Sequence, residues 1–174
     1  CNMGIAGWGG KPKTRFNHTT KEDTRKNAKN MSNNNPIFTL TINPCLDISA
    51  DVDKVRPTRK MRCRNERLDP GGGGINVSRA INILGGTSTA FFPSGGSTGE
   101  IIMEMLKEQG VDTQVTEIEQ MTRQSFAVRE NDSDQQYRFA LPGPELNERS
   151  WQKCLQHITE ATPSPAIVVA SGSL

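Results

Sequence analysis

The sequence predicts an α/β protein, in which a parallel sheet is layered with helices and a second, smaller sheet stands apart from it. Two observations support this prediction. Apolar runs typical of strands alternate with segments that repeat apolar residues at helical spacing, which is the pattern of right-handed βαβ units. Two further extended segments, at about 48–68 and 122–141, are polar and break that alternation. We therefore expect these two segments to form the separate sheet.

The first strand, helix and second strand follow one another closely. Residues 37–42 (IFTLTI) form a run rich in β-branched and aromatic residues, which favours a strand. Beyond a glycine run, apolar residues recur at helical spacing over 75–84, and Gly85-Gly86 is a suitable helix end because glycine readily adopts the left-handed conformation found there. A short strand is expected over 88–92.

The rest of the chain repeats this alternation and adds a hairpin. The expected elements are a helix through 101–106 that ends by Gly110, a strand at 113–118, hairpin strands at 125–129 and 135–141, a helix at 147–160 and a strand at 166–171. The hairpin turn is Asn131-Asp132-Ser133-Asp134. The last strand is continuously apolar between Pro165 and Gly172, which is typical of a buried parallel strand.

A basic leader precedes these elements. Residues 1–31 contain seven Lys or Arg and two acidic residues, a net charge of +5, whereas the whole chain carries +2, so residues 32–174 carry −3. The leader has no periodic apolar face to offset the entropy lost on ordering. We expect residues 1–35 to be disordered and not native, with Met31 as the candidate initiator and 36–174 as the folded part. The alternative, a nucleic-acid-binding arm, lacks helical charge patterning, and we expect no nucleic-acid partner.

Composition argues against several classes of protein. The four cysteines are far apart, show no C-x-x-C spacing and accompany only two histidines, so no zinc or other metal site is predicted. No apolar run approaches the roughly 20 residues that span a bilayer, and no signal peptide opens the chain. We expect a cytoplasmic protein with no membrane partner.

The strongest local motif is the glycine run Gly71–Gly74, followed by Ile75 and Asn76 at a helix start. Without side chains, a ligand can approach backbone amides, and the helix N-terminus favours hydroxyl or phosphate oxygens. A plain glycine-rich connector capped by Asn76 would explain the same pattern. The run does not match the dinucleotide fingerprint, which requires glycine at position 76, and Gly10-Lys11 lacks the spacing of a Walker loop.

Charged residues supply the other candidate contacts. Asp47 is expected in a loop just beyond the first strand, where open α/β sheets bind ligands and where a carboxylate can accept hydrogen bonds from sugar hydroxyls. Arg123, and Lys60 with Arg62, are candidates for holding a phosphate. The alternatives are a turn-forming Asp and solvated surface cations.

Taken together, these motifs resemble one family. Residues 39–47 (TLTINPCLD) are similar to the opening strand of the phosphofructokinase branch of the ribokinase-like (PfkB) carbohydrate kinases, and the glycine run with INVSRA resembles its first sugar-binding signature. The segments 92–100, 122–124, 137–143 and 171–174 are similar to the minor 6-phosphofructokinase isozymes in particular. The resemblance covers about residues 36–174.

The resemblance implies a three-layer α/β/α fold in which the separate sheet is a lid over the sugar that also forms a homodimer. It implies ATP-dependent phosphorylation of fructose 6-phosphate to fructose 1,6-bisphosphate, in glycolysis, with magnesium. Asp47 and Asn76 would hold sugar hydroxyls while backbone at Gly72, Gly73, Gly74 and Ile75 closes on the ligand. Arg123 would meet the phosphate and Ser173 would line the pocket. Lys60, Arg62 and Arg138 are further candidates for phosphate or cross-subunit contacts.

The resemblance also implies what the 174 residues lack. Family members place the catalytic base in a Gly-Ala-Gly-Asp turn and organise magnesium with a later Asn-x-x-Glu, and neither motif occurs here. We expect the catalytic base, metal site and ATP site to follow Leu174, and this chain alone to be inactive. Gly73 favours fructose 6-phosphate, because sugar-1-phosphate kinases of the branch usually carry Lys there. Tagatose 6-phosphate, fructose 1-phosphate and a non-catalytic sugar-phosphate-binding remnant remain alternatives.

Overall fold

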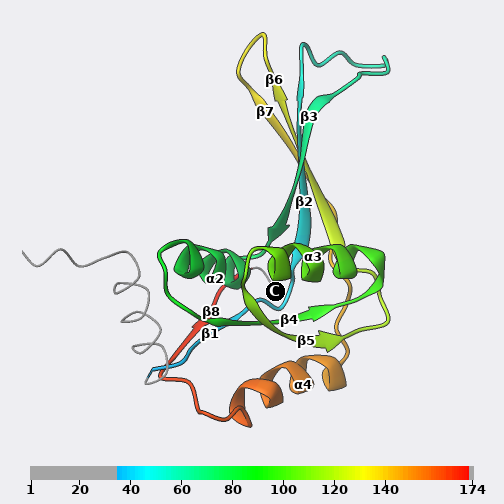
Figure 1. The fold of residues 1–174 in the computed structure, drawn as a ribbon. Coiled ribbons are helices and arrows are strands. Elements are labelled where there is room, and N and C mark those ends of the chain that lie inside the picture. The colour runs from blue at the N-terminus through cyan, green and yellow to red at the C-terminus, as the bar shows by residue number, and fades with distance from the viewer. Residues whose placement is uncertain (1–34, 173–174) are drawn as a thin grey trace, which may run out of the picture.

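The computed structural model describes residues 35–172, which form a parallel sheet between two helical layers and a second sheet rising from it (Figure 1). The mixed α/β class expected from the sequence is confirmed. The parallel sheet consists of β1 (Ile37–Leu40), β4 (Thr89–Ser94), β5 (Asp112–Glu117) and β8 (Ile167–Ala170). The helices are α2 (Gly73–Ile83), α3 (Gly96–Glu108) and α4 (Glu148–Thr159). The second sheet consists of β2 (Cys45–Val52), β3 (Arg64–Gly71), β6 (Arg123–Glu130) and β7 (Gln136–Ala140).

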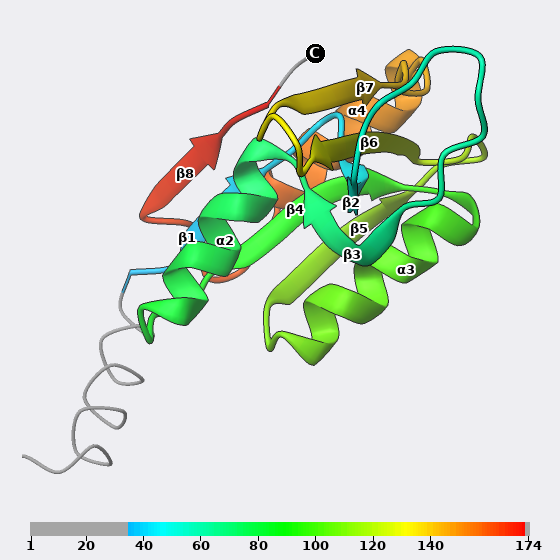
Figure 2. The same cartoon turned by 90° about the horizontal axis from the view of Figure 1, so that it is seen from above.

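Apolar side chains on both faces hold the parallel sheet between its helices. The strand order is β5-β4-β1-β8, and every neighbouring pair is parallel. On one face, α2 and α3 lie side by side (Figure 2), and Ile75, Phe92, Ile102 and Leu106 are almost completely buried there. On the opposite face α4 packs Cys154 and Ile158 against Phe38, Leu40 and Phe91. This double coverage explains why the two central strands, β1 and β4, are mainly apolar and buried.

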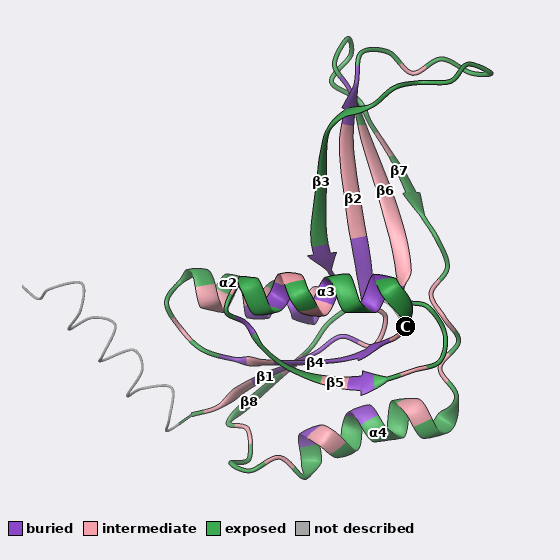
Figure 3. Ribbon diagram, turned by 45° about the vertical axis from the view of Figure 1, so that its right-hand side comes forward, coloured by how far each residue is buried: buried purple, intermediate pink, exposed green. Residues whose placement is uncertain are grey.

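The second sheet has one polar and one apolar face. Its order is β3-β2-β6-β7, with β2 and β6 parallel and both outer pairs antiparallel. Because side chains alternate along a strand, the register aligns Leu68, Ile48, Phe126 and Phe139 in one row across the four strands. The opposite face carries Asp69, Asp47 and Ser125 in a corresponding row. The sheet is buried at its base, where β2 and β3 meet α3, and again at its far end, at Asp51, Val52 and Glu130 (Figure 3).

Three details differ from the sequence-based expectations. Asp47 lies within β2, not in a loop, because residues from Cys45 onward already pair with β3 and β6. The first polar segment is only partly extended, since β3 begins at Arg64 and most of residues 53–63 form a connection. The last strand is parallel as expected but not buried: Ile167 and Val168 are 52% and 46% exposed, because β8 has β1 as its only paired strand among residues 35–172.

The expectations for the leader, residues 1–34, and for Ser173 lie outside the described residues. None of the helices within 35–172 combines the length and apolar character needed to cross a membrane.

Candidate functional site

The glycine run forms the turn between the second sheet and α2. β3 ends at Gly71 and α2 begins at Gly73, and the turn packs against Leu40 and Thr41 at the carboxyl end of β1. Several of its amides already have protein partners: Gly74 N donates to the Ser171 carbonyl at 3.1 Å and Ile75 N to Thr41 Oγ1 at 2.9 Å. The Asn76 amide donates to the Gly72 carbonyl at 2.9 Å. Within residues 35–172, the amides of Gly72 and Gly73 donate no hydrogen bond, so these two are the candidates for ligand contacts in the turn.

Close packing explains why glycine is required in this turn. A Cβ on Gly74 would lie 2.5 Å from the Leu40 carbonyl oxygen and 2.7 Å from Thr41 Oγ1, so any side chain would push α2 away from β1. A Cβ on Gly71 would collide with the Asp47 carboxylate. A plain glycine-rich connector therefore explains part of the motif, because Gly71 and Gly74 are also required for close packing.

The Asp47 carboxylate is oriented by its own strand. Cys45 Sγ donates a hydrogen bond to Asp47 Oδ1 at 2.9 Å, and the second oxygen, Oδ2, faces Gly71. Burial raises the pKa of the Cys45 thiol to about 12, with a further contribution from the neighbouring carboxylate. At neutral pH the thiol is therefore protonated and able to donate.

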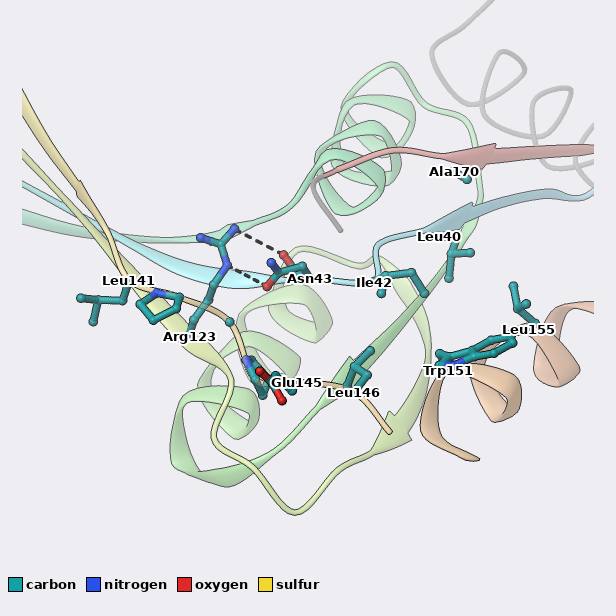
Figure 4. A pocket seen from close by; sticks show the side chains of 13 residues that line it. Leu40, Ile42, Asn43, Arg123, Leu141, Glu145, Leu146, Trp151, Leu155 and Ala170 are labelled. Carbon is teal, nitrogen blue, oxygen red and sulfur yellow. Dashed lines mark hydrogen bonds between the residues drawn. The ribbon is translucent and has the colours of Figure 1, made fainter. Parts of the chain in front are cut away.

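Arg123 lies on the same face of the second sheet as Asp47. It starts β6 opposite Cys45, two residues before the row that contains Asp47 and Ser125. Its Nε donates to Asn43 Oδ1 at 2.9 Å and its Nη2 donates to the Asn43 carbonyl at 3.4 Å (Figure 4). A carboxylate and a guanidinium thus lie close together on neighbouring strands, beside the glycine turn.

A cavity of about 1060 Å³ opens next to Arg123. Asn43, Arg123 and Glu145 line its polar part, while Leu146, Trp151 and Leu155 belong to its apolar part (Figure 4). Of the predicted site residues that lie within 35–172, Arg123 alone lines this cavity. Sequence reasoning did not assign a role to Asn43 or to the connection 141–146, although Asn43-Pro44 directly after a strand was an available signal.

Within 35–172, the other site residues predicted from the sequence lie outside this cavity. Asn76 is exposed on the first turn of α2, where its Oδ1 accepts a 3.4 Å hydrogen bond from Arg79. Arg138 is exposed on β7, and its register with Ala127 places it on the same face as Arg123. Lys60 and Arg62 are exposed in the connection between β2 and β3, at the far end of the second sheet (Figure 1). Within one chain the fold does not bring Lys60 and Arg62 near Asp47 and Arg123. Ser173 lies outside the described residues.

The described residues do not fit a magnesium site. Across 35–172, no group of three or more His, Cys, Asp or Glu side chains is positioned to hold a metal ion. The arrangement suits recognition of a polar, anionic molecule, with hydrogen-bond acceptors at Asp47 and donors at Arg123 and the glycine turn.

Comparisons with known proteins identify a family. Residues 32–174 match the family model described as pfkB family carbohydrate kinase. The chain is 55% identical over 138 residues to ATP-dependent 6-phosphofructokinase isozyme 2 of Mycobacterium tuberculosis, covering 79% of this chain and 41% of that protein. It is 44% identical over 138 residues to ATP-dependent 6-phosphofructokinase isozyme 2 of Escherichia coli, again over 79% of this chain and 44% of that protein.

Solved structures agree with the sequence matches. The crystal structure of phosphofructokinase-2 from Escherichia coli in complex with fructose-6-phosphate matches with a TM-score of 0.75 and 42% identity, over 80% of this chain and 46% of that one.

A more distant relative, the D-tagatose-1-phosphate kinase of Bacillus licheniformis, is 28% identical over 138 residues, covering 79% of this chain and 44% of that protein. The chain thus spans less than half the length of the relatives that it matches.

Proposed function

This chain belongs to the pfkB family of carbohydrate kinases, and we propose that it forms the sugar-phosphate-binding part of an ATP-dependent 6-phosphofructokinase. The reaction would convert fructose 6-phosphate to fructose 1,6-bisphosphate in glycolysis, in the cytoplasm. The observation that carries the proposal is the placement of Asp47, Arg123 and the glycine turn at the base of one sheet face. Support also comes from relatives named 6-phosphofructokinase isozyme 2 at 55% and 44% identity.

Each proposed contact follows from the chemistry of the side chain. Asp47 Oδ2 and the exposed side-chain amide of Asn76 would bind sugar hydroxyls, which both donate and accept hydrogen bonds. The amides of Gly72 and Gly73 would face the sugar, whereas the Gly74 amide bonds Ser171 after β8 and the Ile75 amide bonds Thr41 after β1. Arg123 would bind the phosphate, since a guanidinium forms short, charge-assisted hydrogen bonds to phosphate oxygens.

Phosphoryl transfer would depend on residues outside the described part. Membership of a kinase family implies ATP as the donor, and magnesium would accompany it. We propose that Ser173 completes the sugar pocket and that the catalytic base lies outside this sequence, which contains no Gly-Ala-Gly-Asp turn. We assign substrate binding to the described residues, and no step of phosphoryl transfer.

We further propose that the second sheet is a lid that pairs with its twin in a homodimer. The row Leu68, Ile48, Phe126 and Phe139 leaves an apolar face, and Leu68 and Phe139 are 38% and 58% exposed. Contact between two such faces would cover these side chains. Lys60 and Arg62, at the far end of the sheet, would then reach the partner's site. Phe139→Ser should raise the monomer fraction in light scattering, whereas Gln136→Ser, on the opposite face of β7, should not.

Calorimetric titration of the 174-residue chain with fructose 6-phosphate tests the binding function. Arg123→Ala should weaken binding by about 10- to 100-fold, the loss expected for a hydrogen bond between charged groups. Arg129→Ala is the matched control, because Arg129 lies on the same face of the same strand but bonds Asp51 at 3.2 Å, near the far end. Saturable binding that Arg123→Ala reduces and Arg129→Ala does not would support the proposal.

Other titrants decide the substrate class. Tagatose 6-phosphate and fructose 1-phosphate should bind more weakly than fructose 6-phosphate, and fructose should bind most weakly because it has no phosphate for Arg123. Absence of saturable binding to any sugar phosphate would refute the assignment. Turnover with ATP by the 174-residue chain would refute the proposal that it lacks the catalytic base.

A further inference from the structure

Arg123 meets one residue through two different acceptors. The side-chain oxygen of Asn43 accepts from Nε at 2.9 Å, and the Asn43 backbone carbonyl accepts from Nη2 at 3.4 Å. Both contacts lie on one edge of the guanidinium (Figure 4). Arg123 Nη1 has no partner among residues 35–172. An arginine side chain is flexible unless it is held, so these two contacts restrict it to one orientation while its other edge stays available.

Asn43 is in turn confined by Gly143, which packs against its side-chain amide. A Cβ built on Gly143 would lie 2.9 Å from Asn43 Cγ and 3.0 Å from its Nδ2, and closer still to Oδ1. The backbone of the connection 141–146 is therefore pressed against the Asn43 amide. Gly143 follows β7 of the second sheet, whereas Asn43 follows β1 of the parallel sheet. The position of the guanidinium thus depends on both sheets.

We propose that Asn43, packed against Gly143, is a positioning residue that presents the Arg123 guanidinium to the phosphate of the substrate. This inference rests on the proposed function. An amide suits this role better than a carboxylate, because Asn accepts the hydrogen bond from Nε without neutralising the guanidinium. Aspartate at position 43 would hold Arg123 equally well but would compete with the phosphate for its charge.

Three substitutions separate this role from simple packing. Asn43→Ala removes the side-chain acceptor, and Asn43→Asp keeps an acceptor but adds a negative charge. Gly143→Ala keeps Asn43 but displaces its side chain. Alanine is compatible with the backbone at this position, because Gly143 does not have a positive φ. Circular dichroism of each variant establishes that it is folded. If Asn43→Ala fails to fold, Gly143→Ala perturbs the same contact while keeping the Asn43 side chain.

Calorimetric titration of each 174-residue variant with fructose 6-phosphate measures the effect. We expect Asn43→Ala and Gly143→Ala each to weaken binding about 5- to 10-fold, the change expected for one lost hydrogen bond, and Asn43→Asp to weaken it more. In an Arg123→Ala background the same substitutions should change affinity less than about 2-fold, because the group that they position is absent. Affinity for fructose should not change.

The outcomes are distinguishable. If the unsubstituted chain does not bind fructose 6-phosphate, the proposed function fails and this inference fails with it. If the chain binds and Asn43→Ala and Gly143→Ala leave its affinity unchanged, this inference alone is wrong. It is also wrong if Asn43→Ala weakens binding equally with and without Arg123, since Asn43 would then act independently of the guanidinium.

Discussion

Replacing Thr41 by valine tests how the glycine turn is held in place. The first turn of a helix leaves backbone amides without intrahelical partners, and side chains at the N-cap usually accept their hydrogen bonds. In α2 the N-cap is Gly72, which has no side chain. Thr41, which follows β1, supplies the acceptor instead: its Oγ1 receives the Ile75 amide at 2.9 Å. Thr41→Val removes that oxygen and preserves the shape of the side chain.

The magnitude follows from burial. Thr41 is 1% exposed and Ile75 is 0% exposed, so water cannot replace the lost acceptor without rearrangement. A buried amide left without a partner destabilises a protein by about 1–3 kcal/mol. For a domain of this size, the melting temperature should fall by roughly 3–10 °C. The Ile75 amide should also lose protection against hydrogen exchange.

Thr41→Ser is the matched control. It keeps the hydroxyl and removes one methyl group, which contributes roughly 1 kcal/mol when buried. The two variants can therefore differ modestly in melting temperature, but they should differ clearly in hydrogen exchange at Ile75, which should stay protected in the serine variant alone. Equal protection of the Ile75 amide in Thr41→Val and the unsubstituted chain would refute the capping argument.

Three further predictions concern other parts of the fold. The Glu130 carboxylate accepts hydrogen bonds from Ser133 Oγ and, at 2.7 Å, from the Val55 amide, and these lower its pKa. Because the folded pKa lies below the unfolded one, the stabilisation is present above the ordinary Glu range near 4.5 and is lost as pH falls through the folded pKa. Proteolysis of the connection 53–63 should thus increase on acidification, and Glu130→Gln should reduce this dependence; an identical pH dependence in that variant would contradict the assignment. Iodoacetamide at pH 8 should label exposed Cys63 and spare Cys45, whose thiol stays protonated, and labelling of folded Cys45 at the rate of Cys63 would contradict its burial. Phe92→Ala should lower the free energy of unfolding by about 3–5 kcal/mol in a urea titration, because the side chain is 1% exposed, and a loss below about 1 kcal/mol would count against its place in the core.

Local chemistry explains why much of the fold was predictable. The apolar periodicity around Ile75 and Ile102 identified α2 and α3, since a helix that covers a sheet must bury one stripe of its surface. Extended but polar segments identified the second sheet, because only one face of its strands is apolar. Element boundaries were less accurate: α3 begins at Gly96, several residues before the apolar periodicity begins.

The relation between distant residues was not predictable from local patterns. Asp47 was expected in a loop, yet it belongs to a strand whose pairing with β3 and β6 depends on residues up to about 80 positions away. The last strand was expected to be buried because it is apolar, yet burial depends on which elements cover it. The amides of Gly74 and Ile75 were expected to be available, but Ser171 and Thr41 occupy them.

The sequence by itself determined the α/β class, the chain positions of the helices and strands, and the residue types suited to a sugar phosphate. These follow from periodicity, glycine content and side-chain chemistry, which act over a few residues. The tertiary structure alone decided that Asn43 holds Arg123, that Gly143 confines Asn43, and that Lys60 lies far from Asp47 within one chain. Such contacts join segments separated by up to about 100 residues, and their geometry depends on sheet register and packing, which no local pattern specifies.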